Sequence, residues 1–219
     1  TQTGGHCLTG RQLLPAPPKR RREGGSGRQL LSGVLAAFAV LVASAQVPAI
    51  TWQPQATGTT SRLRGVSAIS PQVAWASGAN GTLLRTVNGG AEWKLLPKPP
   101  GSETLDFRDI DAINNRVAYA LTIGSGETSR IYKTSDGGAH WDLQFANTDP
   151  KVFLDSMAFW DAAHGVAFSD SVDGRFVILI TADGGKSWVG VPQDRLPAAL
   201  PGEGAFAASG TNVAVSGRD

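Results

Sequence analysis

The chain contains 219 residues, with 20 basic and 18 acidic side chains, 27 glycines and one cysteine. Residues 1–45 hold six of the basic residues and one acid, so 14 basic and 17 acidic residues remain beyond them. The chain beyond residue 45 is therefore slightly acidic and has no excess of positive charge to attract nucleic acid. We expect no nucleic-acid partner. The cysteine, Cys7, lies in the leader, so the rest of the chain is expected to form no disulfide.

The first 45 residues have the features of a secretory leader. A basic run at 19–22 precedes the apolar run Leu30–Val42, and Ala43-Ser44-Ala45 has the small residues of a cleavage site. We expect a disordered leader or upstream extension at 1–27 and a signal-peptide hydrophobic region with its cleavage site at 28–45. Cleavage near Ala45 makes the protein extracytoplasmic, that is, periplasmic or secreted. An uncleaved signal segment that anchors the chain in a membrane is the alternative.

One octet occurs three times in the remaining chain. It reads TVNGGAEW at 86–93, TSDGGAHW at 134–141 and TADGGKSW at 181–188, and the closing tryptophans are 48 and 47 residues apart. A second mark, the dipeptide Val-Ala, recurs at a similar period and begins at Val73, Val117, Val166 and Val213. A repeat of this length indicates a propeller, a solenoid or an array.

The unit that contains the second octet divides into four short segments with the character of strands. They are FRDIDAI at 107–113, VAYALTI at 117–123, RIYKT at 130–134 and WDLQF at 141–145. Four strands per repeat match one blade of a β-propeller, and the absence of a helical period disfavours an α-solenoid. We therefore expect an all-β fold, a partial β-propeller of four-stranded blades at 46–219.

The two ends of this region contain incomplete units. ITWQPQ at 50–55 resembles the fourth strand of a preceding blade, and the last residues, GTNVAVSGRD, resemble the first half of a fourth unit. About three and a half blades are therefore expected here, and we expect this chain to be an N-terminal fragment of a longer protein.

The residue types of the octet suit a tight turn between the third and fourth strands. An Asp or Asn side chain accepts hydrogen bonds from the following backbone N–H groups, glycine permits positive φ, and tryptophan covers the turn. A calcium loop is the alternative, but each copy holds a single carboxylate of the expected type. The structural positions are Asn88, Gly90, Trp93, Asp136, Gly138, Trp141, Asp183, Gly185 and Trp188.

The octet resembles the Asp-box, S/T-x-D-x-G-x-x-W, of the BNR-repeat propellers, with Asn88 in the place of Asp in its first copy. The stretch VAWASGANGTLLRTVNGGAEW is similar to repeats of the photosystem II assembly and stability factor propellers and their non-photosynthetic bacterial relatives. This resemblance covers about residues 52–219. It implies a seven-bladed, secreted, non-catalytic binding or assembly propeller whose Asp-boxes lie away from the ligand-binding face.

Sialidases share the Asp-box, so a sialidase-like glycoside hydrolase is the alternative function. Its chemistry requires an arginine cluster, a Tyr nucleophile and acidic partners, which in this reading lie mostly beyond residue 219. Tyr119 and Tyr132 occupy strand positions and are expected in the core, while His140 and His164 lack neighbours at metal-ligand spacing. We expect no catalytic residue, no metal and no cofactor in this part of the chain.

One set of charged residues is a candidate binding surface. Alignment of the units on the expected core residues Val66, Ile110, Met157 and Phe206 brings Arg64, Arg108 and Asp155 into register, with Glu203 beside the fourth position. First strands line the channel of a propeller, so these four residues would surround one opening and bind a protein or glycan partner. Ordinary solvation of the rim, with ion pairs inside each blade, is the alternative.

Overall fold

The computed structural model describes residues 51–207 and 210–217. The expected disordered leader, the signal segment and its cleavage site lie outside the described residues. The secondary structure in the described part consists of β-strands and two short 3-10 helices, η1 (Gly126–Thr128) and η2 (Gln193–Arg195).

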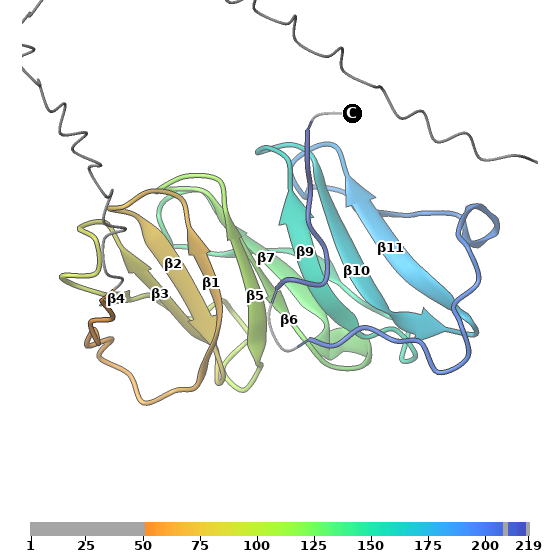
Figure 1. Ribbon diagram of the computed structural model, residues 1–219, viewed down its shortest axis with the longest axis horizontal. Helices are drawn as coiled ribbons and strands as arrows, with labels where there is room; N and C mark the ends of the chain where they lie inside the picture. Colours follow the sequence, from red (N-terminus) through yellow and green to blue (C-terminus); the bar gives the residue numbers. More distant parts are fainter. Residues whose placement is uncertain (1–50, 208–209, 218–219) are drawn as a thin grey trace, which may run out of the picture. The chain divides into compact units, whose positions relative to one another are not determined.

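The strands form three antiparallel sheets of four strands each, which follow one another along the chain (Figure 1). The first blade consists of β1 (Leu63–Ala68), β2 (Ala74–Gly78), β3 (Thr82–Thr86) and β4 (Lys94–Leu95). The second consists of β5 (Phe107–Ala112), β6 (Ala118–Thr122), β7 (Arg130–Thr134) and β8 (Asp142–Ala146). The third consists of β9 (Leu154–Phe159), β10 (Gly165–Val172), β11 (Arg175–Thr181) and β12 (Val189–Gly190). In every sheet the spatial order of the strands follows the sequence, which confirms the expected all-β propeller architecture.

The first strands of the blades lie side by side, with β5 between β1 and β9 (Figure 1). The fourth strands β4, β8 and β12 each begin at the residue after an octet tryptophan, as predicted. The octets therefore connect the third and fourth strands of each blade. We call these three octets the box turns.

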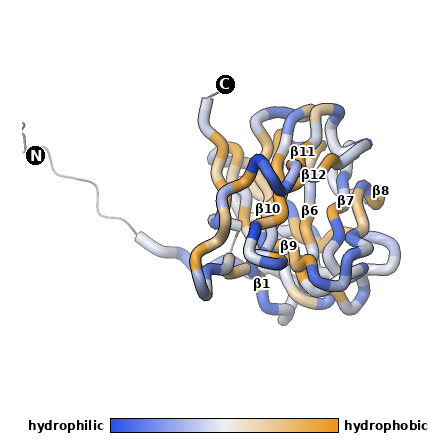
Figure 2. The backbone as a smooth tube through the Cα atoms, turned by 90° about the vertical axis from the view of Figure 1, so that its right-hand side faces the viewer, coloured by the Kyte–Doolittle hydropathy of each residue, from blue (hydrophilic) through white to orange (hydrophobic). Residues whose placement is uncertain are grey.

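Two hydrophobic cores lie between the blades. The first contains Trp75 and Leu83 of the first blade, and Phe107, Tyr132 and Trp141 of the second. The second core joins the second and third blades in the same way. Figure 2 shows hydrophobic residues along the strands and hydrophilic residues in many of the turns. We call the face of a blade that points towards the following blade its forward face, and the face that points towards the preceding blade its backward face.

Two residues expected in the core lie at the surface. Ile110 and Met157 are buried on backward faces, whereas Val66 is 72% exposed because no described blade precedes the first one. Phe206 is 77% exposed, and the described residues of the fourth unit, 204–207 and 210–217, contain no strand. The expected half blade is therefore absent from the described chain, which contains three complete blades.

The Val-Ala dipeptide keeps its phase in only two of the three blades. Ala74 pairs with Ala68 and Ala118 pairs with Ala112, but the equivalent partner of Phe159 is Gly165. Val166 consequently occupies the structural position of Trp75 and Tyr119. The dipeptide of the third blade is displaced by two residues, a shift that leaves its side chains on the same faces of the strand.

Candidate functional site

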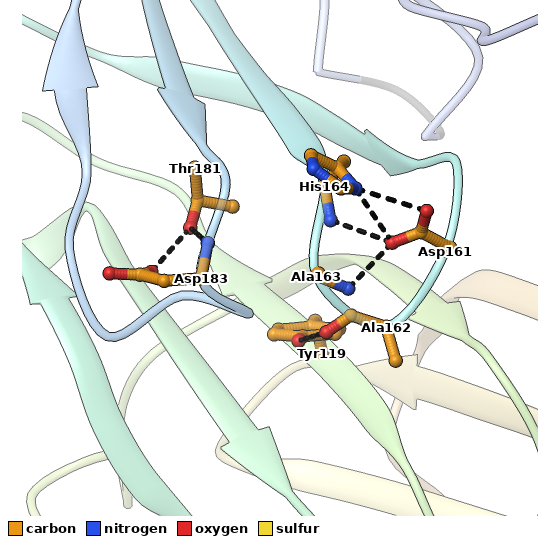
Figure 3. Close-up of polar contacts among 7 residues, drawn as sticks. All are labelled: Tyr119, Asp161, Ala162, Ala163, His164, Thr181 and Asp183. Carbon is orange, nitrogen blue, oxygen red and sulfur yellow. Dashed lines mark hydrogen bonds and ion pairs between the residues drawn. The ribbon is translucent and has the colours of Figure 1, made fainter. Parts of the chain in front are cut away.

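The three box turns have the same pattern of hydrogen bonds. In the third blade the hydroxyl of Thr181 donates to Asp183 Oδ1 (2.9 Å), as drawn in Figure 3, and accepts from the N–H of Gly185 (2.9 Å). Asp183 Oδ1 also accepts from the N–H of Ser187 (3.0 Å). Thr134 and Asp136 form the same contacts in the second blade. Each turn is therefore closed by its own side chains.

Asn88 takes the place of the carboxylate in the first blade. Its Oδ1 accepts from the hydroxyl of Thr86 and from the N–H of Glu92, both at 3.0 Å. An amide oxygen and a carboxylate oxygen thus perform the same task, so the turn does not require a negative charge.

The carboxylates of the two other turns are engaged in local bonds. Hydrogen bonds from Ser187 lower the pKa of Asp183 to about 2, and bonds from His140 hold the pKa of Asp136 well below its ordinary value. Among the described residues no group of three or more His, Cys, Asp or Glu side chains is placed to hold a metal. Both carboxylates thus act as hydrogen-bond acceptors inside their own turns.

Each box turn also contacts the preceding blade. The second glycine of each turn has positive φ. A Cβ atom added to this glycine would contact a side chain of the preceding repeat, which lies three residues after the tryptophan of that repeat. Gly138 meets Leu96 and Gly185 meets Gln144, while Gly90 meets Gln55, three residues after Trp52. The segment before the first blade thus follows the spacing expected of a fourth strand, although residues 51–55 form none.

A second contact links neighbouring blades. Arg85 lies over the ring of Trp75 and donates to the carbonyl of Asn115 in the next blade (2.6 Å). Lys133 lies over Tyr119 in the same way and donates to the carbonyl of Gly184 (2.8 Å). We call this arrangement of a cation over an aromatic ring the clasp.

The two tyrosines and two histidines that could have catalytic roles make contacts within the fold. Tyr119 is buried, stacks on Phe159, and donates to the carbonyls of Ala162 (Figure 3) and Gly184. Tyr132 is buried in the first core and donates to the carbonyl of Pro100. His140 and His164 each contact one aspartate of their own turn, Asp136 and Asp161.

The structure places the four candidate rim residues in three different surroundings. Arg108 and Asp155 line one pocket of about 230 Å³ together with Asp170. Arg64 lines two other pockets, and Glu203 lies in the turn after η2, where its carboxylate accepts from the N–H of Leu200. Arg64, Arg108 and Asp155 thus occupy equivalent positions in the inner strands β1, β5 and β9. Glu203 does not lie in a strand.

The two arginines differ in their availability. Arg108 donates to Asp106 (2.9 Å) and to the carbonyl of Ala207 (2.5 Å), so it acts as an intrachain tie. The buried Nε of Arg64 has no hydrogen-bond partner among the described residues. Arg64 therefore contains a buried donor that no described residue satisfies.

Arg64 borders a pocket of about 240 Å³ on the inner strands, to which all three blades contribute. The pocket also contains Asp109 and Asp111 of β5, which accept backbone hydrogen bonds from Met157 (2.8 Å) and Phe159 (2.7 Å) of β9. We call it the axial pocket. It combines a buried donor that no described residue satisfies with two carboxylates that tie adjacent blades together.

Burial controls the charge of these carboxylates. Desolvation raises the pKa of Asp109 to about 7, against the opposing hydrogen bond from Met157, and the charge of Asp111 adds to the rise. Desolvation also raises the pKa of Asp155 to about 7, with a further contribution from Asp170. Sequence reasoning missed Asp109 and Asp111. The sequence feature that could have revealed them is the segment FRDIDAI, in which an aspartate stands on each side of the expected core residue Ile110.

Comparison with known proteins gives a likeness in structure only. The chain matches no protein-family model, and no characterised protein matches it by sequence. A solved structure described as YCF48 bound to D1 peptide matches 66% of this chain and 46% of its own, at 20% identity and a TM-score of 0.51. YCF48 from Cyanidioschyzon merolae matches at 16% identity, with a TM-score of 0.48 over 61% of this chain and 40% of its own.

Glycoside hydrolases also appear among the similar structures. The GH74 xyloglucanase from Xanthomonas campestris matches 57% of this chain and 19% of its own, at 17% identity and a TM-score of 0.42. The likeness to the first YCF48 structure supports the β-propeller fold, and this chain spans less than half of that structure's length. In the described residues no helix is long and apolar enough to cross a membrane.

Proposed function

We propose that this protein is a non-catalytic β-propeller of the BNR-repeat, Asp-box type that acts as a binding or assembly scaffold outside the cytoplasm. Its partner is a protein segment that is held at the axial pocket. The axial pocket carries this proposal, because residues from three blades converge there and the buried Nε of Arg64 has no hydrogen-bond partner in the part of the chain that the structure describes.

The chemistry of the pocket favours a peptide with an acidic or carbonyl group. A guanidinium donates to carboxylates and carbonyls, while the carboxyl groups of Asp109 and Asp111 line the same pocket and can accept from backbone N–H groups. YCF48, whose fold this chain shares, has been observed with a D1 peptide. That observation supports a protein partner over a glycan.

The proposal is tested by capture of proteins from the extracytoplasmic and membrane fractions of the source cells. Wild-type chain and Arg62→Glu should retain the same partner, whereas Arg64→Glu should lose it, because only Arg64 lines the axial pocket. Overlapping peptides of the retained protein then locate the bound segment. Equal capture by Arg64→Glu would remove the axial pocket from the function, and turnover of a sialoside or xyloglucan would contradict a non-catalytic role.

The secreted location is tested separately. N-terminal sequencing of the protein recovered outside the cytoplasm should begin at Gln46. Retention of the whole leader in the membrane fraction would instead support the uncleaved anchor.

A further inference from the structure

A second pocket lies where β9 and β10 meet the segment 205–207, which follows β12 and returns to the inner strands (Figure 1). Its volume is about 230 Å³, and it shares no lining residue with the axial pocket. We call it the rim pocket. Its charged lining residues are Arg108, Asp155 and Asp170, and its apolar lining residues are Ile123, Phe153, Ala205, Phe206 and Ala207.

Hydrogen bonds to two blades hold the segment 205–207 against this pocket. Asp170 Oδ1 of β10 accepts from the N–H of Ala205 (2.7 Å). Arg108 of β5 donates to the carbonyl of Ala207 (2.5 Å). The wall that this segment provides is therefore fixed by contacts within the chain.

The two carboxyl groups of the rim pocket have no cation beside them. Arg108 pairs with Asp106 at 2.9 Å, so its charge is already balanced. Neither Asp155 nor Asp170 forms an ion pair within the part of the chain that the structure describes. The pocket therefore has an excess of negative charge when both carboxyl groups are ionised.

Asp155 is the more deeply buried of the two. It is 1% exposed, and its Oδ2 has no hydrogen-bond partner among the described residues. Desolvation raises the pKa of this carboxyl group to about 7 and the charge of Asp170 adds to the rise, against hydrogen bonds from the backbone of Ala207 and Asp170. A buried charge without a counter-charge is unfavourable, so a cation at Oδ2 would relieve this cost.

The lining of the rim pocket distinguishes between kinds of cation. A calcium ion takes six or more oxygen ligands, whereas one wall of this pocket is apolar and the described residues contain no group of three or more His, Cys, Asp or Glu placed to hold a metal. A guanidinium bonds best to both oxygens of one carboxylate, but Asp170 already uses one oxygen for Ala205. A primary ammonium can bond separately to two carboxylates, and its alkyl stem packs on apolar surface.

We propose that the rim pocket binds a lysine side chain of a partner protein, with the ammonium group between Asp155 and Asp170 and the methylene stem along the apolar wall. This site is separate from the axial pocket. Arg108 and Asp155, which the sequence analysis grouped in one candidate surface, then have different tasks. Arg108 ties the segment 205–207 to β5, and Asp155 receives the cation.

The first test is an NMR titration of the full chain at about pH 8, where the lysine ammonium is charged, with a blocked peptide Gly-Gly-Lys-Gly-Gly. The amide signals of Asp170, Ala205 and Ala207 should shift until they reach saturation. A second peptide has norleucine in place of lysine and therefore keeps the alkyl stem without the charge. It should bind roughly tenfold more weakly or worse.

Substitutions in the pocket test the two carboxyl groups. Asp155→Asn and Asp170→Asn each remove a negative charge and keep an oxygen that accepts the local hydrogen bonds, and each should weaken the lysine peptide by roughly tenfold. Asp194→Asn is the matched control, because it removes the same charge at an exposed position of η2 outside the pocket. It should bind like the wild type. The spectrum of each variant shows whether it is folded.

The pH dependence provides an independent readout. The charged groups around Asp155 are Asp170 on β10 and Arg108 on β5 with its partner Asp106, whereas the segment 205–207 has none. A carboxyl group with a pKa of about 7 is roughly one-tenth ionised at about pH 6 and roughly nine-tenths ionised at about pH 8. The affinity for the lysine peptide should therefore rise roughly ninefold between these values, and Asp155→Asn should abolish the rise.

Three results would overturn the proposal. The first is the absence of saturable shifts with the lysine peptide, or equal binding of the norleucine peptide. The second is a loss with Asp194→Asn as large as that with Asp155→Asn, which would reduce the effect to net charge. The third is a shift of the same signals by calcium chloride at lower concentration than the lysine peptide, which would make the pocket a metal site.

Discussion

Asn88, Asp136 and Asp183 occupy one position of the box turn and differ mainly in charge. Each accepts a hydrogen bond from a threonine hydroxyl and from a backbone N–H four residues later. The oxygen acceptor is therefore the shared requirement, and the charge is an addition in two of the three copies. This distinction leads to a direct test at a single residue.

Asp136→Ala should lower the midpoint of thermal unfolding, because the N–H of His140 and the hydroxyl of Thr134 lose their acceptor. Asp136→Asn should have a much smaller effect, since Asn88 closes the equivalent turn of the first blade. Circular dichroism during heating measures both variants. Equal losses for the two would show that the turn depends on the charge.

Asp109 predicts how stability changes with pH. The pKa of Asp109 is about 7 in the folded chain and 3.8 when unperturbed, so the folded chain retains a proton that the unfolded chain releases. Its contribution to stability is therefore complete below the lower value and is lost as the pH rises towards the higher one. Asp109→Asn should remove this loss, and it should gain stability relative to wild type above about pH 7.

The measurement is a series of thermal unfolding curves from about pH 4 to about pH 8. Asp155→Asn serves as an independent comparison, because the pKa of Asp155 is also about 7. If the difference between wild type and Asp109→Asn stays constant over the whole range, Asp109 does not titrate in this window.

At the scale of elements, one tryptophan position occurs in three different settings. Trp141 is buried in the first core and meets Trp75, while Trp188 is partly buried beside Phe159. Trp93 faces no complete preceding blade, and its indole N–H donates to Gln55 (2.8 Å). The same residue should therefore contribute differently in each copy.

Trp141→Ala should destabilise the fold by about 3–5 kcal/mol, the usual range for removal of a large buried aromatic side chain. Trp93→Ala should cost less than half of that, because its side chain is only partly covered. Urea unfolding gives both free energies. Similar values for the two variants would mean that the first backward face is covered as completely as the second.

The hydroxyl of Tyr119 joins two elements of the third blade to the second. It donates to Ala162 and Gly184, whose turns are linked by a backbone hydrogen bond from Gly184 to Ala163. Tyr119→Phe keeps the stack on Phe159 and removes only the hydroxyl, so unfolding in urea should show a loss of about 1 kcal/mol. Unchanged stability would indicate that other donors satisfy both carbonyls.

At the scale of the whole molecule, the sequence predicted the blades better than the site. The octets mark the end of every third strand, because a turn with fixed hydrogen bonds constrains both residue type and spacing. Burial was less predictable, because Val66 and Ile110 occupy equivalent positions and only the second has a preceding blade. The rim residues depended on a fourth inner strand at Phe206, and no alternation in the sequence reveals that this strand is missing.

The blades differ in how many of their faces are packed, and this difference should affect local unfolding. Within the described residues the middle blade is packed on both sides, whereas each outer blade packs against one other blade. A linear stack held by nearest-neighbour contacts loses its ends before its centre. Backbone amides of β6 and β7 should therefore exchange with deuterium more slowly than those of β2, β3, β10 and β11, and the slowest of them should report the global unfolding of the molecule.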